Sequence, residues 1–183
     1  IVLTPSRKHV YVSKKSGNYD LYSIDIDGKN NSLLVAGTGN ENNNIALLYK
    51  PSVNFAALVS TRGNQKNSEG ALLSELRVVD VQSGRVDLVA SAEHIQLVDW
   101  AGDRLIFVQE VLATGNEETK HHKIMSYDPK SKQNTEVASN GYFNDVVVLN
   151  DRVYYAADFQ KESSAKLYRA EADGSGKVTL MND

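Results

Sequence analysis

One short pattern recurs four times along the chain: an alternating apolar run that ends in an acidic residue and leads into a tight turn. The four copies are Leu21–Asp25, Leu76–Asp80, Ile124–Asp128 and Leu167–Glu171. Their first residues are separated by 55, 48 and 43 positions. One four-stranded propeller blade needs about 40 to 50 residues. The spacing therefore predicts four repeats of a β-blade.

Short β-strands are expected throughout these repeats, because runs rich in Val, Ile, Leu, Tyr and Phe alternate with polar residues and end in turn residues. The sequence predicts an all-β, propeller-like single domain over 1–183, with four blades of four antiparallel strands. The expected blades are 1–37, 45–91, 94–139 and 143–181. The first strand of the first blade is expected at Ile1–Thr4. Four blades fit a closed ring, a partial propeller, or half of a ring that a second copy completes.

The turn after three of the copies contains glycine, which supplies the positive backbone angle of a tight hairpin. These glycines are Gly28, Gly84 and Gly174. The third repeat has Asp128–Ser131 instead, which suits a type I turn. The stretch Asp25–Asn30 superficially resembles a calcium loop, but it lacks the third acidic position and the terminal glutamate. A hairpin turn is the favoured interpretation.

The composition excludes several function classes. The formal net charge is -3, so the chain offers no long-range attraction to nucleic acid. There is no cysteine, which removes disulfides, thiolate metal sites and cysteine nucleophiles. The longest apolar runs are far shorter than the roughly 20 residues of a membrane helix, so no direct membrane insertion is expected. The chain begins in mid-pattern at Ile1, and we expect any targeting sequence to lie upstream.

The repeats resemble the WD40-like blades of TolB-type bacterial propellers. The best match is Leu21–Gly28, and Thr4–Arg7 and Trp100–Asp103 stand where that family has the turn before its second strand. Lys50–Val53 and Leu149–Asp151 lack the family's glycine. The resemblance covers essentially the whole chain and implies a propeller of the bacterial envelope, periplasmic or extracellular. It assigns no binding residue.

Long connections are expected at one end of the blades, where second strands lead to third strands and one blade leads to the next. They are Gly37–Asn44, Thr61–Ser74 and Val111–His122. Binding residues usually lie on such loops of a rigid scaffold. The candidates are Arg62, Asn64 and Lys66 in one loop and His121 and His122 in another. The alternative is that these polar residues are simply solvated.

Catalytic and metal sites are not indicated. Adjacent residues of a strand point to opposite faces, so His121 and His122 could share a metal only if the chain bends there. There is no Gly-x-Ser-x-Gly motif. Glu110, Asp99 and Asp145 are acidic residues near predicted strands, but one sequence does not show whether any two form a catalytic pair. No cofactor is expected.

The resulting hypothesis is a non-catalytic scaffold for protein-protein interaction or ligand recognition, which binds a protein partner or small ligand at its loop face. A homodimer is a second possible partnership. The alternative function is the propeller portion of a larger prolyl-oligopeptidase-like hydrolase that gates a catalytic domain absent from this chain. A sugar-active propeller enzyme ranks third.

Overall fold

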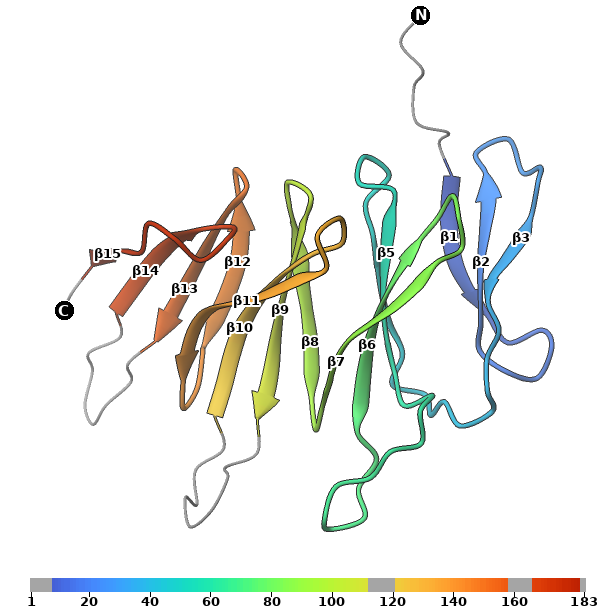
Figure 1. Cartoon of the computed structure of the whole chain (residues 1–183), viewed down its shortest axis with the longest axis horizontal. Helices are drawn as coiled ribbons and strands as arrows, with labels where there is room; N and C mark the ends of the chain where they lie inside the picture. The colour runs from blue at the N-terminus through green and yellow to red at the C-terminus, as the bar shows by residue number, and fades with distance from the viewer. Residues whose placement is uncertain (1–7, 112–120, 158–165, 182–183) are drawn as a thin grey trace, which may run out of the picture. The chain divides into compact units, whose positions relative to one another are not determined.

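The computed structural model describes residues 8–111, 121–157 and 166–181, and all regular secondary structure in them is β-strand (Figure 1). The alternating apolar runs form these strands because the period of two places apolar side chains on a buried sheet face. The chain divides into two compact units, Ile1–Ser91 (unit 1) and Ala92–Asp183 (unit 2). No helix in the described residues is long and apolar enough to cross a membrane.

Unit 1 contains two antiparallel sheets. The first has the order β1-β2-β3 and the second has the order β4-β5-β6-β7. Their strands are β1 (Lys8–Ser13), β2 (Asp20–Asp25), β3 (Ser32–Val35), β4 (Ala46–Tyr49), β5 (Phe55–Ser60), β6 (Ser74–Asp80) and β7 (Val86–Ala92). The apolar cluster between the sheets includes Leu21 and Val35 of the first and Leu58 and Val79 of the second.

Unit 2 also contains two antiparallel sheets, each of four strands, with the orders β8-β9-β10-β11 and β12-β13-β14-β15. Their strands are β8 (Ile95–Ala101), β9 (Arg104–Val111), β10 (His121–Asp128), β11 (Gln133–Asn140), β12 (Asp145–Leu149), β13 (Arg152–Ala157), β14 (Lys166–Glu171) and β15 (Val178–Met181). Ile106 and Ile124 of one sheet share a core with Val153 and Tyr155 of the other.

The expected blade pattern is confirmed: each sheet runs in chain order, and three sheets have four strands. The sheet of β1 has three strands among the described residues, and the strand expected at Ile1–Thr4 lies outside them. One predicted boundary is wrong. His121 and His122 were expected in a loop, but they are the first two residues of β10, because their backbone pairs with the end of β9.

The repeated turns have the predicted chemistry. Gly28, Gly84 and Gly174 have φ values of 80°, 74° and 87°. In the third repeat the left-handed position is taken by Lys132, with a φ of 60°. The amide of Gly28 donates to the carbonyl of Asp25, as expected for a hairpin turn and not for a calcium loop.

Candidate functional site

Unit 2 contains a cavity of about 240 Å³ at the rim of its core. It lies between the sheet of β8 to β11 and the start of β12. Antiparallel pairing brings the start of β8, the end of β9 and the start of β10 to one end of that sheet. This is the end at which the sequence predicts the long connections. The polar residues that line the cavity are His94, Gln96, Glu110, His122, Tyr142, Asn144 and Asp145.

Three lining residues form one row across the sheet. Glu110 of β9 pairs directly with His122 of β10. The amide of Glu110 donates to the carbonyl of His94, one residue before β8, with a nitrogen-oxygen distance of 3.0 Å. Residues opposite each other on neighbouring strands place their side chains on the same face. The row therefore presents an imidazole, a carboxylate and a second imidazole to one cavity.

A β-bulge sets this row. The pairing of β8 with β9 shifts between Leu97 and Asp99, so that Val98 is an extra residue in β8. A slip of one residue moves every later side chain to the other face of a strand. Without the bulge, the register fixed at the turn would place Val111 opposite His94. The extra residue therefore brings His94 and Glu110 to the same face.

The ring of His122 is held in a defined orientation. Its Nδ1 lies 2.8 Å from the carbonyl oxygen of Gly141. A carbonyl oxygen only accepts hydrogen bonds, so Nδ1 carries a proton and Nε2 of the neutral ring presents a lone pair. The ring of Tyr142 contacts that of His122 edge-on, with centroids 5.9 Å apart. His122 thus offers an acceptor beside an aromatic ring.

The second wall of the cavity is the β11–β12 connection and the start of β12. Phe143 is buried and packs edge-on against Tyr155, with centroids 5.6 Å apart. Tyr142 beside it is 56% exposed. Buried Val108 contributes to the apolar part of the lining. The cavity is therefore a mixed recess, in which Val108 and Phe143 supply apolar surface beside a larger number of polar groups and an exposed tyrosine.

The side chains that line the cavity can form hydrogen bonds with a guest. In the described part of the chain, no three His, Asp or Glu side chains are grouped closely enough to hold a metal ion. No serine or threonine is among the residues that line the cavity in the described ranges. Hydrogen-bond acceptors on a partly apolar recess can bind and orient a polar group.

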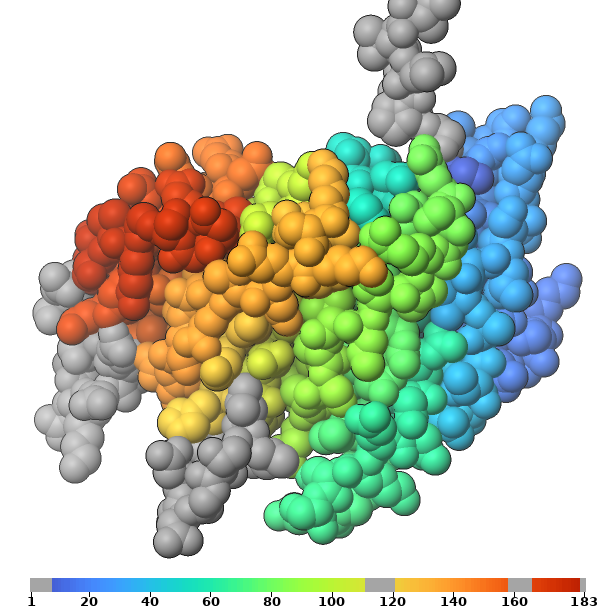
Figure 2. Space-filling model, viewed as in Figure 1, coloured from blue at the N-terminus to red at the C-terminus, as the bar shows by residue number. Residues whose placement is uncertain are grey.

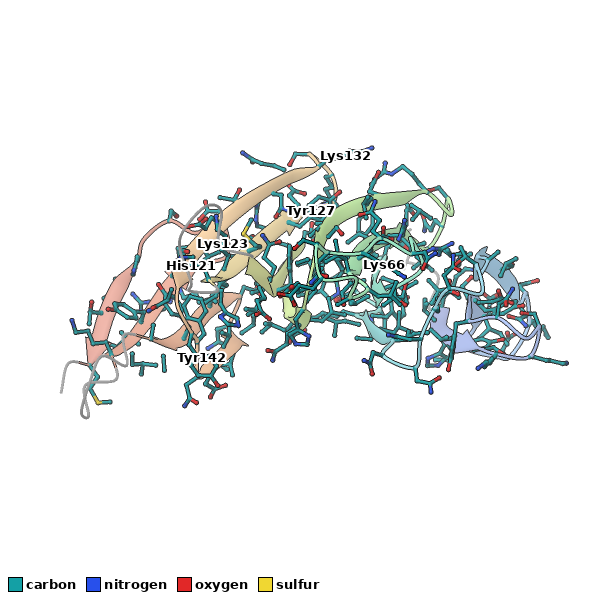
Figure 3. All side chains as sticks on the ribbon, turned by 90° about the horizontal axis from the view of Figure 1, so that it is seen from below. Lys66, His121, Lys123, Tyr127, Lys132 and Tyr142 are labelled. Carbon is teal, nitrogen blue, oxygen red and sulfur yellow. The ribbon has the colours of Figure 1, made fainter. Side chains whose placement is uncertain are left out.

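The five predicted binding residues belong to two different units, with three in unit 1 and the two histidines in unit 2. Arg62, Asn64 and Lys66 belong to the β5–β6 connection of unit 1, and His122 lines the unit 2 cavity. His121 does not line that cavity, since adjacent residues of β10 point to opposite faces. His121 and Lys123 lie together on the strand in Figure 3, apart from Tyr142. The two histidines therefore do not share a ligand site.

Arg62 helps to hold two connections of unit 1 together. Its guanidinium donates to the carbonyl of Ala36 at 2.7 Å, and its own carbonyl accepts from the Thr38 hydroxyl at 3.0 Å. Burial, reinforced by the charge of Arg77, lowers the pKa of Arg62 from its usual value. The pKa of arginine is normally high enough that the group stays charged. Arg62 therefore has a structural role in joining these connections.

The rest of this connection is a small ordered turn. Asn64 has a left-handed φ of 51°, and its amide donates to the carbonyl of Thr61. Lys66 forms a backbone bridge with Leu72, and its exposed side chain is labelled in Figure 3. Gly63 has no room for a side chain, because a Cβ there would lie 1.8 Å from Oε1 of buried Glu75. Asn64 and Lys66 remain exposed candidates on a hydrogen-bonded loop.

The sequence did not identify most of the cavity. His94, Gln96 and Tyr142 were not candidates, and Glu110 and Asp145 were considered only as a carboxylate pair. The alignment of His94 and Gln96 with β9 depends on the bulge at Val98, and Tyr142 and Asp145 come from the β11–β12 connection and the start of β12. Asp99, the third acidic residue considered, accepts a hydrogen bond from the backbone amide of Trp100 at 2.7 Å and does not line the cavity.

No family model matches the sequence, and no curated protein matches it. The structure is similar to an acylaminoacyl peptidase from Pyrococcus horikoshii, with a TM-score of 0.60 and 12% identity over 97% of this chain and 31% of the peptidase. It is also similar to the β-propeller domain of the Trilobed protease from Pyrococcus furiosus, with a TM-score of 0.61 and 14% identity over 95% of this chain and 53% of that one.

A third similar structure is a TolB-type protein from Agrobacterium tumefaciens, with a TM-score of 0.51 and 12% identity. The match covers 96% of this chain and 61% of that protein. The chain thus spans between about a third and three fifths of the structures it matches. Identities this low establish the fold and not the activity. The chain has the all-β fold of propeller blades.

Proposed function

We propose that this chain is a non-catalytic recognition module, and that a segment of a partner protein binds in the unit 2 cavity. The observation that carries the proposal is the row of His94, Glu110 and His122, which faces a recess of mixed polar and apolar lining. Strands hold this row in place, and preorganised groups of this kind bind with little loss of conformational entropy.

The size of the cavity supports a side-chain-sized guest. Pockets for drug-sized ligands have volumes of about 300 to 1,000 Å³. The cavity here has about 240 Å³, which is below this range and suits one side chain of a partner. The remaining contacts would come from residues around the rim, including the exposed ring of Tyr142. A bacterial envelope or extracellular location is part of the proposal and is supported by the resemblance of the repeats to TolB-type blades.

A second candidate is the propeller portion of a larger hydrolase. It is favoured by the similarity of the fold to an acylaminoacyl peptidase and to the propeller domain of a protease. In that case the cavity would contact a polypeptide substrate or the catalytic domain. The presence of a serine-elbow hydrolase domain in the complete gene would support this candidate.

Selection from a phage-displayed library of random peptides tests the recognition role. Peptides enriched on the purified protein should bind it and should bind much less to the Gln96→Trp variant, in which the indole fills the cavity. Gln96 is an exposed residue of β8, so this change leaves the core intact. The matched control is Gln133→Trp, an exposed position of β11 that does not line the cavity.

The proposal is wrong if no peptide is enriched, or if the enriched peptides bind Gln96→Trp as well as they bind the unchanged protein. Retained binding by Gln133→Trp together with lost binding by Gln96→Trp supports it. Circular dichroism of both variants checks that they remain folded.

A further inference from the structure

We infer that the unit 2 cavity accepts a positively charged side chain, arginine above all, from the partner. This inference rests on the proposed recognition function and names the chemistry of the group that is bound. It is carried by the charges of the lining residues, by the orientation of His122 and by the exposed aromatic ring of Tyr142.

The charges of the cavity favour a cation. Glu110 and Asp145 contribute two carboxylates, and the described lining contains no lysine or arginine. With neutral imidazoles, the formal charge of the lining is therefore negative. A carboxylate has about four acceptor positions, so Glu110 can accept from a guest in addition to its contacts within the protein. An anionic guest would be repelled.

The hydrogen-bonding groups favour donors on the guest. In the neutral imidazole of His122, Nε2 is an acceptor, because Nδ1 donates to the carbonyl of Gly141. Gln96 adds an amide oxygen at the same rim. A guanidinium carries five N–H donors and no acceptor, which makes it the best match for several acceptors facing one space.

The aromatic rim favours arginine over a small inorganic cation. Tyr142 is exposed beside the opening, and the face of a tyrosine attracts a guanidinium or ammonium group within about 6 Å. The buried Val108 and Phe143 provide apolar surface for the methylene stem of such a side chain. The lack of a metal-ligating group of three in the described residues is consistent with an organic cation.

A pair of short peptides tests this inference. Acetyl-Gly-Arg-Gly-amide and acetyl-Gly-citrulline-Gly-amide have nearly the same shape, but only the first is charged. In nuclear magnetic resonance titrations, we expect the arginine peptide to shift the backbone amide signals of His122 and Tyr142. The citrulline peptide should bind at least tenfold more weakly than the arginine peptide. Raising the salt concentration should lower the affinity of the protein for the arginine peptide.

A double variant identifies the groups responsible. The double variant Glu110→Gln, Asp145→Asn should bind the arginine peptide at least tenfold more weakly. Both charge-assisted hydrogen bonds from the guanidinium to these carboxylates are lost in it. The control is Glu136→Gln with Asp103→Asn, which removes the same charge from carboxylates that pair with Lys123 and Lys130 outside the cavity. This control variant should bind the arginine peptide with the affinity of the unchanged protein.

Equal binding of the two peptides, or no signal shift with either peptide up to about 10 mM, would overturn the inference. Equal affinity of the Glu110 and Asp145 double variant and the unchanged protein would also overturn it. These failures are distinct from failure of the proposed function. A cavity that selects peptides without basic residues keeps its recognition role and loses only the cationic guest.

Discussion

Gly102 in the turn between β8 and β9 shows how single residues determine the hairpins of this chain. Its φ is 57°, and its amide donates to Oδ1 of Asp151 at 2.7 Å. A side chain in this left-handed conformation places its Cβ close to a carbonyl oxygen and costs about 1 to 2 kcal/mol. Glycine avoids this cost. Gly141, in the β11–β12 connection, has no left-handed φ, and neither glycine has another atom within 4 Å of an added Cβ.

These two glycines form a matched pair for substitution. Gly102→Ala should lower the free energy of unfolding by about 1 to 2 kcal/mol, because only the backbone conformation is unfavourable. Gly141→Ala should leave it unchanged or raise it by up to about 1 kcal/mol, because alanine restricts the unfolded chain. Urea denaturation of the two variants measures the difference. Equal effects of the two changes would contradict the argument.

Asp20 is a buried carboxylate that organises the end of unit 1. Oδ2 accepts from the hydroxyl of Ser16 at 2.6 Å, and Oδ1 accepts from the amide of Gly37 at 2.7 Å. These two hydrogen bonds lower the pKa of Asp20 below its usual value. Hydrogen bonds similarly lower the pKa of Asp25, chiefly from Asn30, and of Asp173, chiefly from Ser175.

These carboxylates predict loss of stability in acid. A carboxyl group whose pKa is lowered by folding stabilises the native state above its unfolded pKa of about 3.9, and that contribution disappears as the pH falls through the folded pKa. The free energy of unfolding should therefore decline below about pH 4. Asp20→Asn should be less stable than the unchanged protein at pH 7, and the difference should shrink toward pH 2. Urea denaturation across this range measures it, and a constant difference at all pH values would contradict the linkage.

The strands were largely predictable from the sequence. The four copies of the repeated pattern lie in β2, β6, β10 and β14, and each of these strands ends at the acidic residue that ends the copy. The pattern is reliable here because each strand buries one face and the turn residues mark its ends. It predicts the start of β10 poorly, because His121 and His122 are polar and resemble a loop.

The candidate site was less predictable because it depends on pairing. His94 and Glu110 are far apart in sequence, and their alignment requires the extra residue Val98. Val98 packs against the unit 2 core, and this long-range contact is not visible in the local pattern around it. An apolar residue in an alternating run gives no local sign that it forms a bulge. The sequence therefore indicated the end of the blades at which the cavity lies and one histidine that lines it, but not the arrangement of the cavity.

At the scale of the whole molecule, one face of the β12–β15 sheet carries exposed apolar side chains among the described residues. One face of the β12–β15 sheet contributes to the core of unit 2. The opposite face carries the row Val147, Tyr154, Arg169 and Val178, with Leu149 nearby. Val147, Leu149 and Val178 are 46%, 58% and 41% exposed, and β15 is visible in red at the surface in Figure 2. Contiguous exposed apolar residues often mark an interface.

We expect a second copy of the chain to cover this face. Light scattering should give a mass that rises with concentration toward twice 20.1 kDa. Leu149→Lys should keep the protein at the mass of one chain, because a charge buried within an apolar interface must lose its hydration on association. Leu33→Lys, an exposed position of β3 in unit 1, is the control and should behave like the unchanged protein. A single-chain mass for the unchanged protein at all concentrations would contradict the expectation.

The hydrogen-bond registers contain one feature that repeats with the blades. In three sheets the outermost pair of strands is irregular at the same repeat position, between Leu21 and Tyr22, Ile124 and Met125, and Leu167 and Tyr168. A bulge increases local twist and interrupts the straight row of free amides and carbonyls that a foreign strand would extend. β3, β11 and β15 are therefore poor templates for added strands. A chain built almost wholly of β-structure thereby gains resistance to fibril growth from a local irregularity.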